Sequence, residues 1–200
     1  MPQPSHPSFD VAVVGGGIIG LAVGWRAAQR GMRVVVLERD APGSGATHAA
    51  AGMLAPASEA NLAERDLLAL GLASAARFPA FVAELREVAG VDPGFLPCGT
   101  LVVARDRDEA EALERERRAR EELGLDVARL RPSEARRREP ALAPTLRLAL
   151  DVPDDHAVDP RALAAALAAA VPAAGGEVRA GAAVARVDVA DGRVAGVTLA

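Results

Sequence analysis

The sequence contains no lysine and no tyrosine, so all 23 basic residues are arginine, and it has a single cysteine, Cys98. A lysine amine is required by enzymes that bind pyridoxal phosphate as a Schiff base and by the Walker A loop of nucleoside triphosphatases. Both classes are therefore excluded within these 200 residues. A lone cysteine forms no intramolecular disulfide, and such low cysteine use is typical of a reducing compartment.

Metal-ligand patterns are missing as well. The three histidines, His6, His48 and His156, are scattered along the chain without the spacing of metal ligands. We therefore expect no metal site. Any demanding chemistry should come from a cofactor.

Net charge and hydropathy further restrict the kind of protein and the partners that we expect. Half of the residues are apolar and a quarter are charged, which is typical of a globular protein. The net charge of −4 disfavours a nucleic-acid partner. The first ten residues lack the pattern of a secretory signal, and no apolar stretch near residue 11 reaches about 20 residues without a glycine. We expect a cytoplasmic protein without a membrane partner.

The first forty residues show the pattern of a β-α-β unit. Residues 9–14 form a short β-branched run, as in a buried parallel strand. A glycine-rich turn follows, and then a helix that should end near Gly31. A second buried strand, residues 33–37, leads into Glu38.

The glycine-rich turn, residues 15–20, predicts a phosphate loop. Gly15 permits a tight turn, Gly17 lets the backbone approach a pyrophosphate, and Gly20 lets the helix pack on the strand. Ile18 and Ile19 open the helix, whose N-terminal amides and partial positive charge stabilise an anion without any lysine.

Glu38 strengthens this prediction. It lies 23 positions after Gly15, at the end of the second strand, where an acid accepts the ribose hydroxyls of a dinucleotide. A glycine turn without a ligand is the competing interpretation. The acid disfavours the extra phosphate of NADP, but the loop cannot distinguish FAD from NAD, because both carry an adenosine pyrophosphate.

The rest of the chain gives weaker signals. Residues 40–56 are small and polar and predict a loop, and the following helix extends to about Ala89 with a kink or a fresh start at Pro79. Alternating charges in residues 106–123 predict a solvated helix with opposite charges one turn apart. The spacing gives three such pairs: Glu111–Arg115, Glu114–Arg118 and Glu116–Arg120.

The remaining elements follow from capping and turn residues. Pro132 and the pair Asp159-Pro160 each begin a helix. Asp191-Gly192 predicts a hairpin turn between two strands. The other expected strands are residues 99–104, 177–179, 182–189 and 193–199.

One stretch identifies a family. Residues 45–56, GATHAAAGMLAP, together with Glu38-Arg39, resemble the D-amino-acid oxidase and glycine oxidase superfamily of flavoenzymes. The segment AAAGML is especially similar to glycine oxidases of the thiamine-biosynthesis type. Shorter supporting matches are CGTL at 98–101, REP at 138–140 and VDPRAL at 158–163.

The resemblance implies an α/β architecture, a Rossmann-like FAD-binding fold of the glutathione-reductase type with part of an α+β substrate domain. Residues 1–94 would be the first segment of the FAD-binding domain, 95–147 a partial substrate domain and 148–200 an incomplete second FAD-binding segment. The chain ends inside strand-like sequence, and we expect it to be truncated.

The resemblance also implies which residues contact FAD. Small residues after the ribose acid would let backbone groups reach the flavin, and the strand residue Val184 would face the adenine. The simpler alternatives are an alanine-rich loop and an ordinary core valine. The flavin-side residues implied are Thr47, Ala50, Ala51, Gly52, Met53 and Leu54, with Arg39 beside the ribose acid.

Three residues invite functional interpretations that we consider weaker. His48 lies beside the flavin loop and could link the flavin covalently, although a polar loop side chain is the simpler explanation. Cys98 has no basic neighbour in sequence, which favours a buried small hydrophobe over a nucleophile. His156 is expected to be an ordinary loop residue.

The implied reaction is oxidation of a small amine or amino acid by O₂. The arginine that grips the substrate carboxylate would belong to a C-terminal half, so the catalytic residues stay unknown. A related sarcosine or D-amino-acid oxidase or dehydrogenase remains an alternative. So does a non-catalytic flavin-binding fragment or one half of a split protein. A homo-oligomer is possible in each case.

Overall fold

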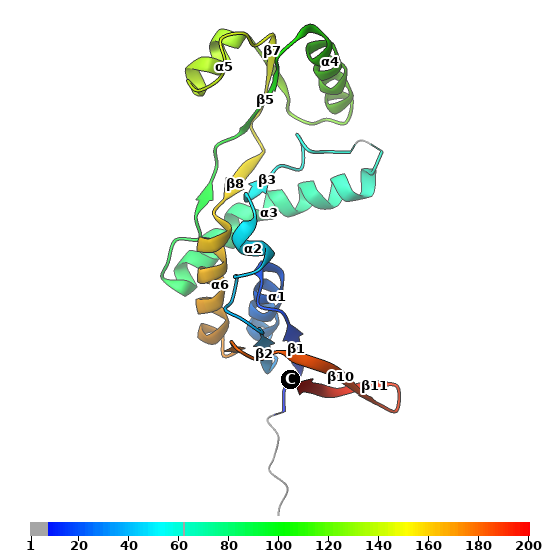
Figure 1. The fold of residues 1–200 in the computed structure, drawn as a ribbon, viewed down its shortest axis with the longest axis vertical. Coiled ribbons are helices and arrows are strands. Elements are labelled where there is room, and N and C mark those ends of the chain that lie inside the picture. The colour runs from blue at the N-terminus through cyan, green and yellow to red at the C-terminus, as the bar shows by residue number, and fades with distance from the viewer. Residues whose placement is uncertain (1–7, 62) are drawn as a thin grey trace, which may run out of the picture. The chain divides into compact units, whose positions relative to one another are not determined.

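The computed structural model describes residues 8–61 and 63–200, which group into two compact units (Figure 1). The first unit contains the chain up to Ala51, Phe81–Gly94 and Asp159–Ala200. The second contains Gly52–Ala80 and Phe95–Val158. The predicted boundary at residue 94 is also a boundary between units. Residues 52–80 and 148–158, which we assigned to the FAD-binding domain, group with the second unit, and the assignment of domains by function stays a prediction.

The first unit is built on the predicted β-α-β motif. Strands β1 (Val11–Val14), β2 (Val34–Leu37) and β9 (Glu177–Arg179) form a parallel sheet in the order β1-β2-β9. All four residues of β2 are buried, as expected for a central strand of a parallel sheet. Helices α1 (Ile18–Gln29) and α6 (Pro160–Ala173) pack on each other in this unit.

A glycine permits close contact between α1 and the sheet. A Cβ atom on Gly24 would lie 2.6 Å from Cγ2 of Val36, closer than real Cβ atoms come. On the same helix Trp25 is fully buried, and its ring packs edge-on against Phe81 with 5.5 Å between centroids. The predicted tight packing of the helix on the strand is therefore present.

The C-terminal hairpin is also as predicted. Strands β10 (Val184–Ala190) and β11 (Arg193–Leu199) pair antiparallel. Asp191 and Gly192 have φ values of 53° and 73°, and two positive φ values are the signature of a type I′ turn.

The second unit contains two small antiparallel sheets. Strands β5 (Thr100–Ala104), β7 (Leu148–Val152) and β6 (Ala128–Leu130) form one, in the order β5-β7-β6. The other has the order β3-β8-β4. Its strands are β3 (Met53–Leu54), β8 (His156–Val158) and β4 (Phe95–Leu96).

Helices α4 (Arg107–Glu122) and α5 (Pro132–Arg138) also belong to this unit. Asp106 caps α4 by accepting a hydrogen bond from the Glu109 amide. Of the predicted ion pairs, Glu114–Arg118 and Glu116–Arg120 are present at 3.7 and 2.9 Å. Glu111 instead pairs with Arg107 at 2.9 Å, one turn towards the N-terminus.

Helix α3 (Arg65–Ala89) contributes to both units. It continues through Pro79, so the expected fresh start at that proline is wrong. The unit boundary falls one residue later, between Ala80 and Phe81. By length and composition α3 could cross a membrane, which is weak evidence because helices of soluble proteins pass the same test.

Several local expectations are corrected. The predicted loop 40–56 contains a short helix, α2 (Ala46–Ala49), and strand β3. Cys98 is exposed rather than buried, and it lies in the connection between β4 and β5. His156 begins strand β8 rather than lying in a loop, and its ring packs edge-on against Phe95.

Candidate cofactor-binding site

A groove of about 620 Å³ lies in the first unit, where β1 and β2 end and α1 begins. Ligand sites commonly have volumes between about 300 and 1,000 Å³. The carboxyl ends of parallel strands are the usual binding edge of such a sheet. The lining residues are Val14, Gly15, Gly17, Ile18, Ile19, Leu37, Glu38, Arg39, Asp40, Gly43, Ser44, Gly45, Ala46, Thr47, Ala50, Ala182, Ala183 and Val184.

The glycine turn has the backbone that the sequence predicts. Gly15 has a φ of 105°, a conformation that other residues rarely adopt. A Cβ atom on Gly20 would lie 2.0 Å from the Gly15 carbonyl oxygen. The first turn of α1 can therefore approach the end of β1 only because residue 20 has no side chain.

The N-terminus of α1 faces this groove with favourable electrostatics. Gly17 is the N-cap, and none of the first-turn residues of α1, all of which are described, is acidic. The Ile18 amide donates to the Thr47 hydroxyl at 3.2 Å. Helix geometry leaves the other first-turn amides without partners in the helix, and the dipole adds a partial positive charge. An anion is stabilised at such a position.

Glu38 lies at the same place. One of its carboxylate oxygens accepts from the Gly16 amide at 2.6 Å and the other accepts from the Asp40 amide at 2.9 Å. The Asp40 amide, followed by the Gly16 amide, holds the pKa of Glu38 below its ordinary value, so the side chain is ionised at neutral pH. A Cβ atom on Gly16 would lie 2.9 Å from that of Glu38.

The structure brings most of the predicted site residues together. Nine of the fourteen line the groove: Gly15, Gly17, Ile18, Ile19, Glu38, Arg39, Thr47, Ala50 and Val184. Gly20 lies behind the groove against Gly15, and Ala51 is exposed in the same unit. Gly52, Met53 and Leu54 belong to the second unit. Contact of all fourteen with FAD stays a prediction.

Two residues singled out in the sequence, Val184 and His48, have contacts of their own within the first unit. Val184 packs against a buried cluster that contains Val35, Leu37 and Ala182. Val184 thus lines the groove and is also partly buried, and its contact with the adenine stays a prediction. His48 is exposed in α2, and its carbonyl oxygen accepts a hydrogen bond from Arg161 at 3.0 Å.

Residues 43–46 were missed as lining residues. Gly43 has a φ of 77°, and its amide donates to the Gly16 carbonyl at 2.9 Å, which ties this turn to the glycine loop. A Cβ atom on Gly43 would lie 2.9 Å from that of Ala164 on α6. The glycines at 43 and 45 carried this signal in the sequence, but composition alone predicts only a loop.

A family model described as FAD dependent oxidoreductase matches residues 10–200. The chain belongs to this FAD-dependent family. The cofactor of the family is FAD, as the sequence predicts, and the α/β FAD-binding fold is confirmed.

Individual relatives agree with this placement. Glycine oxidase of Geobacillus kaustophilus is 42% identical over 168 residues, which are 84% of this chain and 44% of that protein. The crystal structure of glycine oxidase from Bacillus cereus has a TM-score of 0.89 at 31% identity over 96% of this chain and 51% of that one. The bifunctional protein ThiO/ThiG of Trichormus variabilis is 33% identical over 189 residues, 94% of this chain and 28% of that protein. The chain thus spans about half of these glycine oxidases.

The groove fits the pyrophosphate half of FAD. The first turn of its helix contains no acidic residue, and Gly15 and Gly20 leave room for close approach of the backbone. Glu38 retains lone pairs for ribose hydroxyls in addition to its two amide bonds. The residues that would hold the dinucleotide are those lining the groove.

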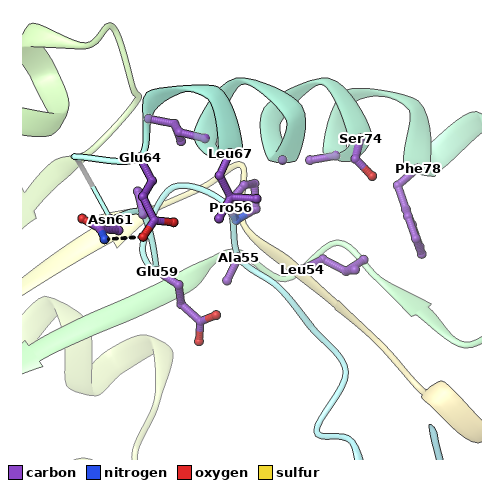
Figure 2. Close-up of a pocket in the computed structure, with 13 residues that line it drawn as sticks. Leu54, Ala55, Pro56, Glu59, Asn61, Glu64, Leu67, Ser74 and Phe78 are labelled. Carbon is purple, nitrogen blue, oxygen red and sulfur yellow. Dashed lines mark hydrogen bonds between the residues drawn. The ribbon is translucent and has the colours of Figure 1, made fainter. Parts of the chain in front are cut away.

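A second groove, of about 340 Å³, lies entirely in the second unit. Leu67, Ser74 and Phe78 project from α3 on one side, and Leu54 of β3 and Pro56, which follows this strand, lie on the other (Figure 2). Asn61 donates to Glu64 at 2.9 Å at one end. This groove is apolar apart from these two residues, Glu59 and Ser74.

Proposed function

We propose that the protein is an FAD-dependent oxidase of small primary or secondary amines, of the glycine oxidase type. The observation that carries the proposal is the groove at the N-terminus of α1, with the ionised Glu38 at its edge. The glycine oxidases of Geobacillus kaustophilus and Bacillus cereus support the substrate class.

The proposed overall reaction converts glycine, O₂ and water into glyoxylate, ammonia and H₂O₂. FAD, when bound, supplies the acceptor for the hydride that leaves the substrate α-carbon. The chain's own residues bind and orient the cofactor: the amides of the α1 N-terminus hold the pyrophosphate, and Glu38 accepts the ribose hydroxyls. We assign no catalytic residue in this chain.

The similarity to the putative thiamine biosynthesis oxidoreductase ThiO of Rhizobium etli, which is 37% identical over 161 residues, supports a role in thiamine biosynthesis. In this proposal the imine formed from glycine serves thiazole formation. The compartment proposed for this role is the cytoplasm. A homo-oligomer is compatible with it.

The first test is the absorption spectrum of the purified intact protein. We expect flavin bands at nearly one FAD per chain, released intact on denaturation. A colourless protein that gains no flavin on incubation with FAD would contradict the proposal.

The second test compares H₂O₂ release from glycine, sarcosine and D-alanine. Oxidation of glycine with the highest kcat/KM supports the glycine oxidase type, whereas preference for sarcosine or D-alanine supports the alternative oxidases. Reduction of an artificial electron acceptor without H₂O₂ release would overturn the oxidase assignment. Bound FAD without turnover of any amine would favour the non-catalytic alternative.

A further inference from the structure

Two charged side chains are buried in the second unit without pairing with each other. Asp155 is 0% exposed and Arg120 is 6% exposed. Burial of a charge is costly unless hydrogen bonds compensate it. Both side chains form hydrogen bonds with the backbone of the same two residues, Ala57 and Ser58.

Asp155 accepts both amides of this dipeptide. Its two carboxylate oxygens receive the Ala57 amide at 3.0 Å and the Ser58 amide at 2.7 Å. Arg120 donates to both carbonyls, from Nε to Ala57 at 2.9 Å and from Nη2 to Ser58 at 2.8 Å. Its remaining Nη1 donates to Glu116 at 2.9 Å. All four polar backbone groups of the dipeptide are therefore held by two side chains.

The dipeptide connects two parts of the second unit. It follows strand β3 by two residues, and Asp155 immediately precedes β8, the partner of β3, with Leu54 opposite His156. The Ala57 side chain packs in the core of the β5-β7-β6 sheet with Leu113 and Val152. The dipeptide thus joins the β3-β8 pair to this larger sheet.

The segment that contains this dipeptide, residues 54–60, forms one wall of the second groove. Leu54, Ala55, Pro56, Glu59 and Ala60 line it opposite α3. Several of these side chains are too small to fix the segment by packing alone. Hydrogen bonds to its backbone provide the constraint that small side chains cannot.

We propose that Asp155 and Arg120 are positioning residues for the oxidation: they hold the Ala57–Ser58 peptide and thereby fix strand β3 and this wall of the groove. The inference rests on the proposed function and on the flavin-side position that the family resemblance implies for Met53 and Leu54 of β3. Displacement of a group that orients reactants by about 1 Å can reduce a rate by about a hundredfold.

Conservative variants test this arrangement, in which Asp155 and Arg120 hold the Ala57–Ser58 backbone and which we call the clamp. Asp155→Asn retains the shape but has only one acceptor oxygen, so one buried amide loses its partner. Arg120→Lys replaces a fork of donors by a single ammonium, which cannot donate to both carbonyls in the same geometry. The matched controls are the exposed neighbours, Asp154→Asn beside Asp155 and Arg118→Lys on the same helix.

Hydrogen exchange of the intact, FAD-loaded protein gives the first readout. We expect exchange of the Ala57 and Ser58 amides to accelerate about tenfold or more in both clamp variants, with unchanged exchange in β1 and β2. The two control variants should exchange like the wild type. Unchanged exchange at residues 57 and 58 would overturn the clamp.

The second readout is kcat per bound flavin, together with the visible circular dichroism of the flavin. We expect kcat to fall about tenfold or more in Asp155→Asn and Arg120→Lys at equal FAD content, with altered visible circular dichroism of the flavin. A purely structural role would lower the melting temperature but leave kcat and the flavin band unchanged, which would overturn the proposal. The flavin band reports positioning even if no amine is oxidised, so failure of the proposed function and failure of this inference are distinguishable.

Discussion

Glu38 and Asp155 each accept a backbone amide on both carboxylate oxygens, but with different consequences. Glu38 accepts those of Gly16 and Asp40 at the edge of the groove and stays partly exposed. Asp155 accepts those of Ala57 and Ser58 and is fully buried. The first retains lone pairs on a partly exposed side chain, whereas the second is fully buried and holds the backbone of its own unit.

The variant Glu38→Ala should weaken FAD binding. It removes the proposed ribose acceptor and the bond that orients the Gly16 amide. Loss of hydrogen bonds to a charged group costs about 1 to 3 kcal/mol, which is about 5- to 150-fold in Kd. Fluorescence titration of the apoprotein with FAD measures this change. Glu87→Ala, at an exposed acid on α3, is the control, and equal Kd values for the two variants would contradict the role of Glu38.

Glu38 should also make stability depend on pH. Its pKa in the folded protein lies below the ordinary value of 4.5, chiefly because of the Asp40 and Gly16 amides. Its stabilising contribution is therefore present above about pH 4.5 and is lost as the pH falls through the lowered pKa. The difference in unfolding free energy between wild type and Glu38→Gln should shrink from about pH 6 to about pH 3. Urea unfolding at several pH values measures it, and a constant difference would refute the assignment.

At the residue scale, the sequence was informative where a backbone requirement fixes the residue type. Gly15, Gly20 and Glu38 could be placed because a tight turn, a close contact and a strand-end acid each restrict the choice. The burial of Arg120 could not be predicted, because the alternating charges of its helix predict a solvated face. The one available signal was its spacing of seven from Leu113, which puts both on the buried face of α4.

At the element scale, the contact between α1 and β2 sets the position of the helix N-terminus over the groove. A Cβ atom on Gly24 would lie 2.6 Å from Cγ2 of Val36, and Val36 is fully buried. Insertion of atoms into such a contact forces the helix outward.

Gly24→Ala should therefore destabilise the first unit. Alanine gains about 1 kcal/mol of helix propensity, but overpacking costs about 1 to 3 kcal/mol, and the buried Val36 favours the upper part of that range. We expect a net loss of about 1 to 2 kcal/mol in urea unfolding. Val36→Ala in the Gly24→Ala background removes the clashing methyl and should be less destabilising than additivity predicts. Gly196→Ala, where a Cβ atom meets nothing within 4 Å, is the matched control.

Long or capped elements could be predicted, and so could the three-residue strand β9, but the short strands β3, β4 and β8 could not. The hairpin of β10 and β11 carries its turn signal in Asp191-Gly192, and α6 carries its cap in Asp159. Strands β3 and β8 have two and three residues, and they pair across about a hundred residues of sequence. No local pattern encodes such pairing, because it depends on the packing of the whole unit.

At the scale of the whole molecule, the two units differ in a way that spectroscopy can use. The only tryptophan of the chain, Trp25, is fully buried in the first unit, and the chain has no tyrosine. Tryptophan fluorescence therefore follows the first unit alone, whereas far-ultraviolet circular dichroism follows the helices of both.

FAD should stabilise the folded first unit, whose unfolding in urea is reported by Trp25 fluorescence. A ligand that binds only the folded state adds about 2.7 kcal/mol of stability at a free concentration of 100 times its Kd. Because the groove lies in the first unit, removal of FAD should shift the fluorescence transition to lower urea. The same experiment on Glu38→Ala, at the same free FAD concentration, should give a smaller shift because binding is weaker. An FAD effect on circular dichroism without any effect on Trp25 fluorescence would place the cofactor elsewhere and contradict the site.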